Sequence, residues 1–181
     1  MNLGHIKTIL QQGGVIAYPT EAVFGLGCDP LNESAVKKLL QIKNRSINKG
    51  LILIAADYQQ IKPYIQELAP EKMQAILNTW PGAFTWIFKS SSLTPKWIRG
   101  DHETVAVRVT NHPIAKQICQ AFAGAIVSTS ANVAEQAPAR TAAEVAAMFE
   151  DGIDLIVDAE CGSNKNPTQI RNALTGEIFR Q

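Results

Sequence analysis

The sequence has little of what secreted and membrane proteins contain. Its three cysteines, Cys28, Cys119 and Cys161, are far apart and odd in number, and none forms a Cys-x-x-Cys pair. This argues against a disulfide framework or a zinc knuckle, so we expect reduced thiols. No run approaches the ~18 apolar residues of a membrane span, and residues 1–12 lack the apolar centre of a signal peptide. The protein is therefore predicted to be soluble and cytoplasmic, with no membrane partner.

Net charge is almost absent as well. The 17 Lys and Arg residues are balanced by 16 Asp and Glu residues, which leaves a formal net charge of +1. A protein that coats nucleic acid or binds broadly to acidic membranes carries far more positive charge, so any basic surface must be a local cleft. The 181 residues, 46% of them hydrophobic, suit one domain over 1–181, and two independent domains would be cramped.

Several common catalytic motifs are missing. There is no Walker loop, and no Gly-x-Gly-x-x-Gly follows a predicted strand. The histidines His5, His102 and His112 are isolated, which argues against a catalytic zinc site, and no Gly-x-Ser-x-Gly elbow supports a serine nucleophile. We therefore expect a cationic cleft lined by hydroxyl groups, which orients reactants and stabilises charge.

What the chain does contain is a concentration of positive charge over residues 43–50. Lys43, Arg45 and Lys49 lie between a helical pattern and the apolar run 51–54. Two cations at a helix C-terminus suit the helix dipole, and charge runs usually form solvated surface. Lys49 directly precedes a buried strand, so its side chain must point either into a cleft or into solvent. Taken alone, this stretch favours an ordinary solvated surface, and a phosphate site needs support from elsewhere in the chain.

Two stretches rich in hydroxyl groups follow predicted strands. Residues 19–29, which include Thr20, follow the apolar strand 15–18, and residues 128–132, with the sequence Ser-Thr-Ser-Ala-Asn, follow the strand 125–127. Polar groups at the end of a buried strand are where α/β proteins place ligands, and hydroxyls with free N–H groups can hold phosphate or carboxylate oxygens. A plain turn is an equal alternative for the first stretch. A cap or turn needs fewer polar residues than the second stretch contains.

An arginine lies in the middle of a strongly alternating segment. Residues 104–109 place three valines on one face and Thr104, Ala106 and Arg108 on the other. If the second face is covered, Arg108 needs an anionic partner. From the alternation alone, an arginine that faces solvent or pairs with an acid such as Glu103 is the simpler interpretation.

Hydrophobic periods and capping residues predict an α/β fold. Helices are expected over 2–12, from 32 or 34 to 43, from about 57, over 70–78, from 111 to 123, and over 141–150, the last opened by a capping box. Strands are expected over 15–18, 51–54, 83–88, 104–109, 125–127, 153–157, 169–171 and 177–180, with a loop over 161–168. Because strands alternate with helices, while 83–109 and the C-terminal hairpin add antiparallel pairs, we expect a mixed sheet with flanking helices.

These motifs, taken in order, resemble those of the YrdC-like threonylcarbamoyl-AMP synthases, in their short single-domain TsaC form. The resemblance covers essentially the whole chain. It is carried by Tyr18-Pro19-Thr20-Glu21 with Phe24-Gly25-Leu26-Gly27, Lys43-x-Arg45 with Lys49-Gly50, Val107-Arg108-Val109, Ser128-Thr129-Ser130-Ala131-Asn132, and Leu174 to Arg180. Each motif is weak alone, whereas their order and spacing together are specific.

The resemblance implies a twisted mixed parallel and antiparallel sheet with an open, positively charged hollow. In that hollow L-threonine, bicarbonate and ATP would give threonylcarbamoyl-AMP and pyrophosphate, which makes the protein a nucleotidyltransferase. Its product would serve the threonylcarbamoyladenosine modification beside the anticodon of tRNAs that read ANN codons. Separate proteins would transfer the group to tRNA, and Mg²⁺ would be carried by ATP, with no metal site in the protein.

The resemblance also implies roles for individual residues. Lys43, Arg45 and Lys49 would hold ATP phosphates, with Arg45 and Lys49 as the catalytic pair. Ser130, Asn132, Arg140 and Arg180 would help to bind the nucleotide. Thr20, Arg108 and Ser128 would hold threonine, with Arg108 on its carboxylate.

Two other functions stay open at this point. An RNA-binding module could use the same basic hollow for tRNA or double-stranded RNA without turnover, although Tyr18, Phe24 and Trp86 are predicted to be core residues rather than stacking platforms. A carbamoyl transferase acting on another acceptor is also possible, since a YrdC-like domain occurs in hydrogenase maturation proteins. The zinc-finger and acylphosphatase-like segments of those proteins are absent from this sequence.

Overall fold

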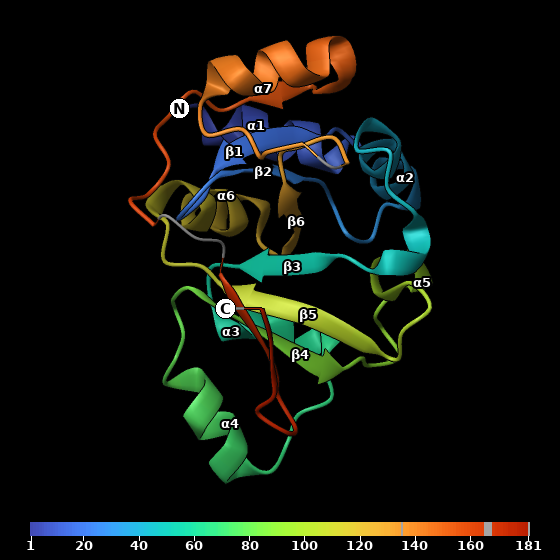
Figure 1. Cartoon of the computed structure of the whole chain (residues 1–181), viewed down its shortest axis with the longest axis vertical. Helices are drawn as coiled ribbons and strands as arrows, with labels where there is room; N and C mark the ends of the chain where they lie inside the picture. The colour runs from blue at the N-terminus through green and yellow to red at the C-terminus, as the bar shows by residue number, and fades with distance from the viewer. Residues whose placement is uncertain (135, 165–167, 181) are drawn as a thin grey trace.

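A computed structural model describes residues 1–134, 136–164 and 168–180 of the chain (Figure 1). Its strands form one nine-stranded sheet in the order β7-β1-β2-β6-β3-β5-β4-β8-β9. The strands are β1 (Ile16–Pro19), β2 (Phe24–Gly27), β3 (Ile52–Ala55), β4 (Phe84–Lys89), β5 (Thr104–Val109), β6 (Ile126–Ser130), β7 (Leu155–Ile156), β8 (Gln169–Asn172) and β9 (Ile178–Arg180). Residues 165–167 of the loop predicted over 161–168 lie outside the described part.

The helices begin where the capping residues predict. The side chains of Asn2, Asn32, Asp57 and Thr141 each accept a hydrogen bond from a backbone N–H of the helix that follows. The α-helices are α1 (Leu3–Gln11), α2 (Glu33–Ile42), α3 (Tyr58–Ile61), α4 (Pro70–Leu77), α5 (Lys96–Arg99), α6 (Pro113–Phe122) and α7 (Ala142–Phe149). Short 3₁₀ turns are η1 (Ile47–Lys49), η2 (Lys62–Tyr64) and η3 (Glu150–Gly152).

The pairing of the strands confirms the prediction of a mixed sheet. The pairs β1–β7, β3–β5 and β4–β8 are parallel, whereas β1–β2, β2–β6, β3–β6, β4–β5 and β8–β9 are antiparallel. The antiparallel β4–β5 pair and the C-terminal hairpin β8–β9 are the two antiparallel pieces predicted from the sequence.

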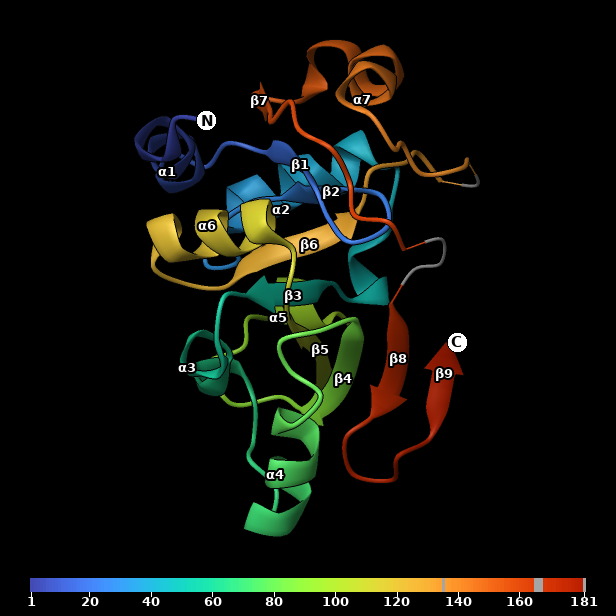
Figure 2. The same cartoon turned by 90° about the vertical axis from the view of Figure 1, so that its left-hand side faces the viewer.

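Side chains alternate along the central strands between two apolar clusters on opposite faces of the sheet. Ile54 of β3 joins the smaller cluster, which α1 and α6 cover together (Figure 2). Leu53 and Ala55 join the larger cluster, to which α2, α4 and α7 also contribute. In β5 the three valines enter the larger cluster, so the predicted alternation of residues 104–109 is confirmed. Arg108 therefore lies on the same face as α6, beyond the part that the helix covers.

Several predicted boundaries are wrong. Residues 24–27, part of the stretch 19–29 that was predicted to hold a ligand or to form a plain turn, form β2, and the hydroxyl residues 128–130 lie within β6 rather than in a loop after it. The helix α6 begins at Pro113 with His112 as its N-cap, one residue later than predicted. At α7 half of the predicted capping box forms, because the Glu144 carboxylate accepts from the backbone N–H of Arg140 and not from that of Thr141.

Two glycines in β2 explain why the sequence pattern did not predict this strand. Phe24 and Leu26 are fully buried, but Gly25 and Gly27 take the alternate positions where a strand pattern shows side chains. A Cβ atom on Gly27 would lie 2.7 Å from the Val127 carbonyl oxygen and 2.8 Å from Tyr18 Cε1. The glycine therefore permits a close approach of neighbouring strands.

We expect the substitution Gly27→Ala to lower the free energy of unfolding by about 1–3 kcal/mol, because the added methyl group overpacks the sheet. Urea unfolding followed by circular dichroism measures this. Gly124→Ala is the matched control, since the nearest atom to its new Cβ, 3.6 Å away, belongs to the Phe122 ring. Equal stability of the two variants would contradict the close packing at Gly27.

Two further predictions concern the cysteines and the membrane. Cys28, Cys119 and Cys161 are free thiols, the first two buried, as the absence of a disulfide framework predicts. Within the described residues, none of the helices has the length and apolar character needed to cross a membrane.

Candidate functional site

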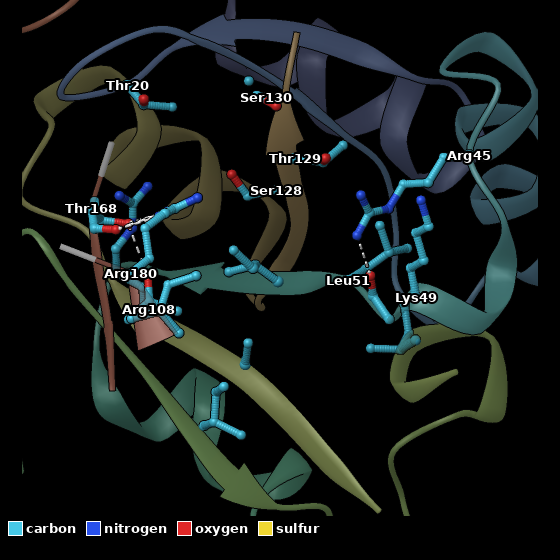
Figure 3. A pocket seen from close by; sticks show the side chains of 18 of the residues that line it. Thr20, Arg45, Lys49, Leu51, Arg108, Ser128, Thr129, Ser130, Thr168 and Arg180 are labelled. Atoms are coloured by element: carbon cyan, nitrogen blue, oxygen red, sulfur yellow. Dashed lines mark hydrogen bonds between the residues drawn. The ribbon is translucent and has the colours of Figure 1, made fainter. Parts of the chain in front are cut away.

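A cavity of about 540 Å³ opens on the sheet face beyond α6 (Figure 3). Ile52 of β3, Thr104 and Ala106 of β5, Ile87 of β4 and Ile170 of β8 contribute to its lining. Small-molecule sites in proteins typically measure roughly 300–1,000 Å³, so this cavity is large enough for a nucleotide-sized ligand.

The charge of the cavity lining is positive. Among the described residues, those that line the cavity include no Asp or Glu. Five lining residues carry a basic side chain, namely Arg45, Lys49, Arg99, Arg108 and Arg180. Since the whole protein has a net charge of only +1, this site concentrates positive charge in one place and favours an anionic ligand.

The cations lie at two ends of the cavity (Figure 3). Arg45 and Lys49 lie together at one end, and Arg108 and Arg180 lie at the other. Hydroxyl groups from β6 and from the loop after β1 lie between them, contributed by Thr20, Ser128, Thr129 and Ser130. A ligand with two separate anionic groups matches this spacing of charge.

The basic stretch reaches the cavity because α2 ends sharply. Asn44 has a positive φ of 49°, which turns the chain out of the helix. Arg45 Nη2 then donates to the Gly50 carbonyl, 3.0 Å away, and this bond fixes the guanidinium at the cavity wall. Lys49, at the end of η1, is exposed, and its side chain makes no hydrogen bond or ion pair with any other described residue. Its ammonium is therefore available to a ligand.

Lys43 is used differently from the other two cations of this stretch. It is buried, and its Nζ donates to the Ser130 carbonyl at 2.5 Å, to the Asn132 carbonyl at 2.8 Å and to Asn132 Oδ1 at 3.1 Å. Burial, with a smaller contribution from the like charge of Arg45, lowers the pKa of Lys43 to about 8. The cavity-lining residues do not include Lys43. These hydrogen bonds show that Lys43 stabilises the C-terminal end of β6.

Asn132 and Arg140 also lie outside the cavity lining. Asn132 Oδ1 accepts from Ser130 Oγ at 2.6 Å, and its Nδ2 donates to the carbonyl oxygens of Val133 and Gln136. Asn132 therefore shapes the chain that follows β6. Arg140 is exposed next to the N-terminus of α7, and its backbone N–H donates to Glu144 Oε2. Contacts of these two side chains with a nucleotide stay predictions.

Arg108 has an acidic partner, but not Glu103, the acid considered from the sequence. Its Nη1 lies 3.3 Å from Glu21 Oε2, and both side chains are almost fully buried. Burial raises the pKa of the Glu21 carboxyl, but the charge of Arg108 and hydrogen bonds from Thr110 and Asn111 outweigh it, so the pKa lies below its ordinary value. The pair is therefore ionised at neutral pH.

Arg180 joins the C-terminal hairpin to the same end of the cavity. Its Nε and Nη2 both donate to the Thr168 carbonyl, at 3.0 and 2.8 Å. Thr168 in turn shares a 3.0 Å hydrogen bond with Thr85 of β4. The short strand β9 of the predicted hairpin thus places a cation beside Arg108 of β5 (Figure 3).

Sequence reasoning missed three residues of the site. Glu21 belongs to the stretch that follows β1, and an acid next to Thr20 in a stretch expected to bind ligands was the signal that could have marked it. Arg99 lines the cavity from the end of α5, and Thr168 lines it directly before β8. Nothing in their local sequence distinguishes these two residues from ordinary loop residues.

Comparison with known proteins identifies the family of this chain. Residues 8–181 match the Sua5/YciO/YrdC family, which carries the description "Telomere recombination". A threonylcarbamoyl-AMP synthase of Coxiella burnetii is 51% identical over 171 residues, which cover 94% of this chain and 92% of that protein. A protein of the same name from Klebsiella pneumoniae is 50% identical over 181 residues, which cover 99% of this chain and 95% of that protein.

A solved structure shows the same fold. The crystal structure of P. abyssi Sua5 complexed with L-threonine matches with a TM-score of 0.90 and 28% sequence identity over 97% of this chain. This chain spans 52% of the length of that protein. The match over nearly the whole sequence and the common fold confirm the resemblance seen in the motifs. The chain belongs to the Sua5/YciO/YrdC family.

Proposed function

We propose that this protein is a threonylcarbamoyl-AMP synthase, which converts L-threonine, bicarbonate and ATP to threonylcarbamoyl-AMP and pyrophosphate. The observation that supports this most directly is the cavity with cations at both ends. Arg45 and Lys49 suit the phosphates of ATP, and Arg108 at the other end suits the carboxylate of threonine. The two bacterial relatives at about half identity bear this activity in their names.

The chemistry needs a site of this kind. The threonine amine and bicarbonate give a carbamate with loss of water, and a carbamate oxygen then attacks the α-phosphorus of ATP. The bond between the α-phosphorus and its bridging oxygen breaks, and pyrophosphate leaves. Both reactants are anions, so cations and fixed hydrogen-bond donors are required to bring them together. Arg45 and Lys49 are placed to stabilise the negative charge of the leaving group.

The remaining roles come from the family resemblance. Thr20 and Ser128 supply hydroxyl groups to threonine, and Ser130 contacts the nucleotide. Arg180 also contacts the nucleotide, although it lies at the same end of the cavity as Arg108. A direct contact of Lys43 with phosphate stays a prediction, as do contacts of Asn132 and Arg140. Magnesium enters as part of the MgATP substrate, because the described lining offers hydroxyls and cations but no carboxylate.

The proposal extends to the cellular role. The product serves the threonylcarbamoyladenosine modification beside the tRNA anticodon, and separate proteins complete the transfer. We place the protein in the cytoplasm, in keeping with three free cysteines. Residues 1–181 act as one domain, since the described strands form a single sheet, and strands β2 to β6, β8 and β9 contribute residues to the cavity.

The comparisons favour this reading over an RNA-binding module without turnover. Tyr18, Phe24 and Trp86 are buried, as predicted, so none of them offers a platform on which a base could stack. Binding of tRNA or double-stranded RNA to the basic cavity stays a separate prediction.

One assay tests the function. The protein is incubated with ATP, bicarbonate and radiolabelled threonine, and we expect pyrophosphate and a labelled adenylate in equal amounts. Omission of bicarbonate, threonine or ATP must each abolish both products. RNA binding in a gel-shift experiment, together with no adenylate under any condition, would favour the binding module instead.

A further inference from the structure

Arg108 is held from one side by a carboxylate that sequence reasoning did not assign. Glu21 lies in the loop between β1 and β2, and its Oε2 is 3.3 Å from Arg108 Nη1. The side chains are 11% and 7% exposed, so the contact is shielded from water. A buried carboxylate next to a guanidinium interacts far more strongly than a surface pair.

Glu21 is itself fixed by contacts on its other oxygen. Glu21 Oε1 accepts from Thr110 Oγ1 at 2.8 Å and from the backbone N–H of Asn111 at 3.2 Å. The Glu21 carbonyl accepts from the backbone N–H of Asn164 at 3.0 Å. Gly162 packs so closely there that a Cβ atom on it would lie 2.7 Å from that carbonyl oxygen. The carboxylate therefore has one oxygen committed to the end of β5 and one directed at Arg108.

The guanidinium keeps unused donors. Glu21 Oε2 pairs with Nη1 by charge at 3.3 Å without a hydrogen bond, and the buried Arg108 Nε makes no hydrogen bond either. A guanidinium carries five N–H donors in a plane, and its two edges can bind two different carboxylates. Arg108 also lines the cavity, so the donors of its two terminal nitrogens, unlike the buried Nε, are within reach of a ligand. Thr20, adjacent to Glu21 in the chain, lines the cavity as well.

We propose that Glu21 is a positioning residue that fixes the plane of the Arg108 guanidinium, so that its free donors receive the carboxylate of threonine. This inference rests on the proposed function. The loop between β1 and β2 would then have two roles, because Thr20 faces the substrate and Glu21 holds the Arg108 side chain in place. Glu21 lies outside the cavity lining and acts through Arg108 alone.

The variant Glu21→Gln tests this role. Glutamine retains an oxygen for Thr110 and Asn111, but it presents an uncharged amide group to Arg108. We expect the KM for threonine to rise about 10–100-fold, the range of a charge-assisted hydrogen bond, while the KM for ATP stays within about twofold. Steady-state kinetics with each substrate varied separately measure the two constants.

A substrate without a carboxylate separates positioning from a general structural role. For L-threoninamide, we expect wild-type protein and Glu21→Gln to have equal kcat/KM, because Arg108 has no carboxylate to bind. A variant with a damaged fold would lose activity on both substrates. Glu103→Gln is the matched control, since Glu103 is exposed near the start of β5, and we expect no change in either constant.

Several outcomes overturn the inference. An unchanged or lowered KM for threonine in Glu21→Gln would do so, the lowered value because it would show that Glu21 competes with the substrate. If that variant does not fold, Glu21→Asp replaces it, since aspartate keeps the charge but is shorter by one methylene group. Its KM for threonine must rise, and its kcat/KM for L-threoninamide must not change. A wild-type protein that forms no threonylcarbamoyl-AMP would instead remove the proposed function itself.

Discussion

Replacement of Lys49 with alanine lowers the rate of threonylcarbamoyl-AMP formation by about 10²–10³-fold, the loss expected when a group that stabilises developing charge is removed. Lys49 is exposed at the cavity, and its ammonium makes no hydrogen bond or ion pair with other described residues, so its charge is available for ATP phosphates. The same isolation means that the fold does not depend on it. Pyrophosphate release and labelled adenylate measure the rate, and thermal unfolding should be unchanged.

The matched control is Lys37→Ala. Lys37 is an exposed lysine in α2, before the basic stretch, and among the described residues its ammonium pairs only with Glu33, four residues earlier on the helix surface. Such a pair contributes about 0.3–0.5 kcal/mol, so neither activity nor stability should change measurably. Undiminished turnover in Lys49→Ala would remove Lys49 from the mechanism, and an equal loss in both variants would indicate a nonspecific effect of charge.

Features that depend on local sequence were predictable. The alternation of residues 104–109 places Arg108 on the opposite face of the sheet from the three valines, because successive side chains in a strand point to opposite faces. The cluster of cations after α2 marked one end of the cavity, and of the two positions left open for Lys49, a cleft or solvent, the structure places it at the cavity. Polar residues at the end of β6 likewise face the cavity. Each of these inferences needs only a few neighbouring residues.

Features that depend on distant contacts were not predictable in the same way. Lys43 meets Ser130, 87 residues further along the chain, and Thr110 meets Glu21 across 89 residues. Nothing in the sequence around Lys43 shows whether this lysine binds phosphate or stabilises the end of a strand. The strand β2 was hidden for a different reason, since its glycines remove the side chains that reveal a strand pattern.

We expect Lys43→Met to lower the free energy of unfolding by about 2–4 kcal/mol, because buried carbonyl oxygens lose their donor and each such loss costs about 1–3 kcal/mol. Methionine fills the space of the lysine stem but cannot donate to Ser130 or Asn132. The end of β6 then loses its support, and the hydroxyl groups of the cavity move out of place. Activity should therefore fall together with stability. Urea unfolding followed by tryptophan fluorescence measures the change.

The contrast with Lys49 decides what the basic stretch does. If Lys43 only contacted phosphate, Lys43→Met would impair the use of ATP and leave stability unchanged, just as Lys49→Ala is expected to leave stability unchanged. The structure instead predicts a loss of stability that causes the loss of activity, since the Lys43 ammonium is surrounded by acceptors of its own chain. Lys37→Met on the exposed face of α2 should change stability by less than about 0.5 kcal/mol. One short segment thus supplies both a cation for the substrate and a cation for the wall that holds it.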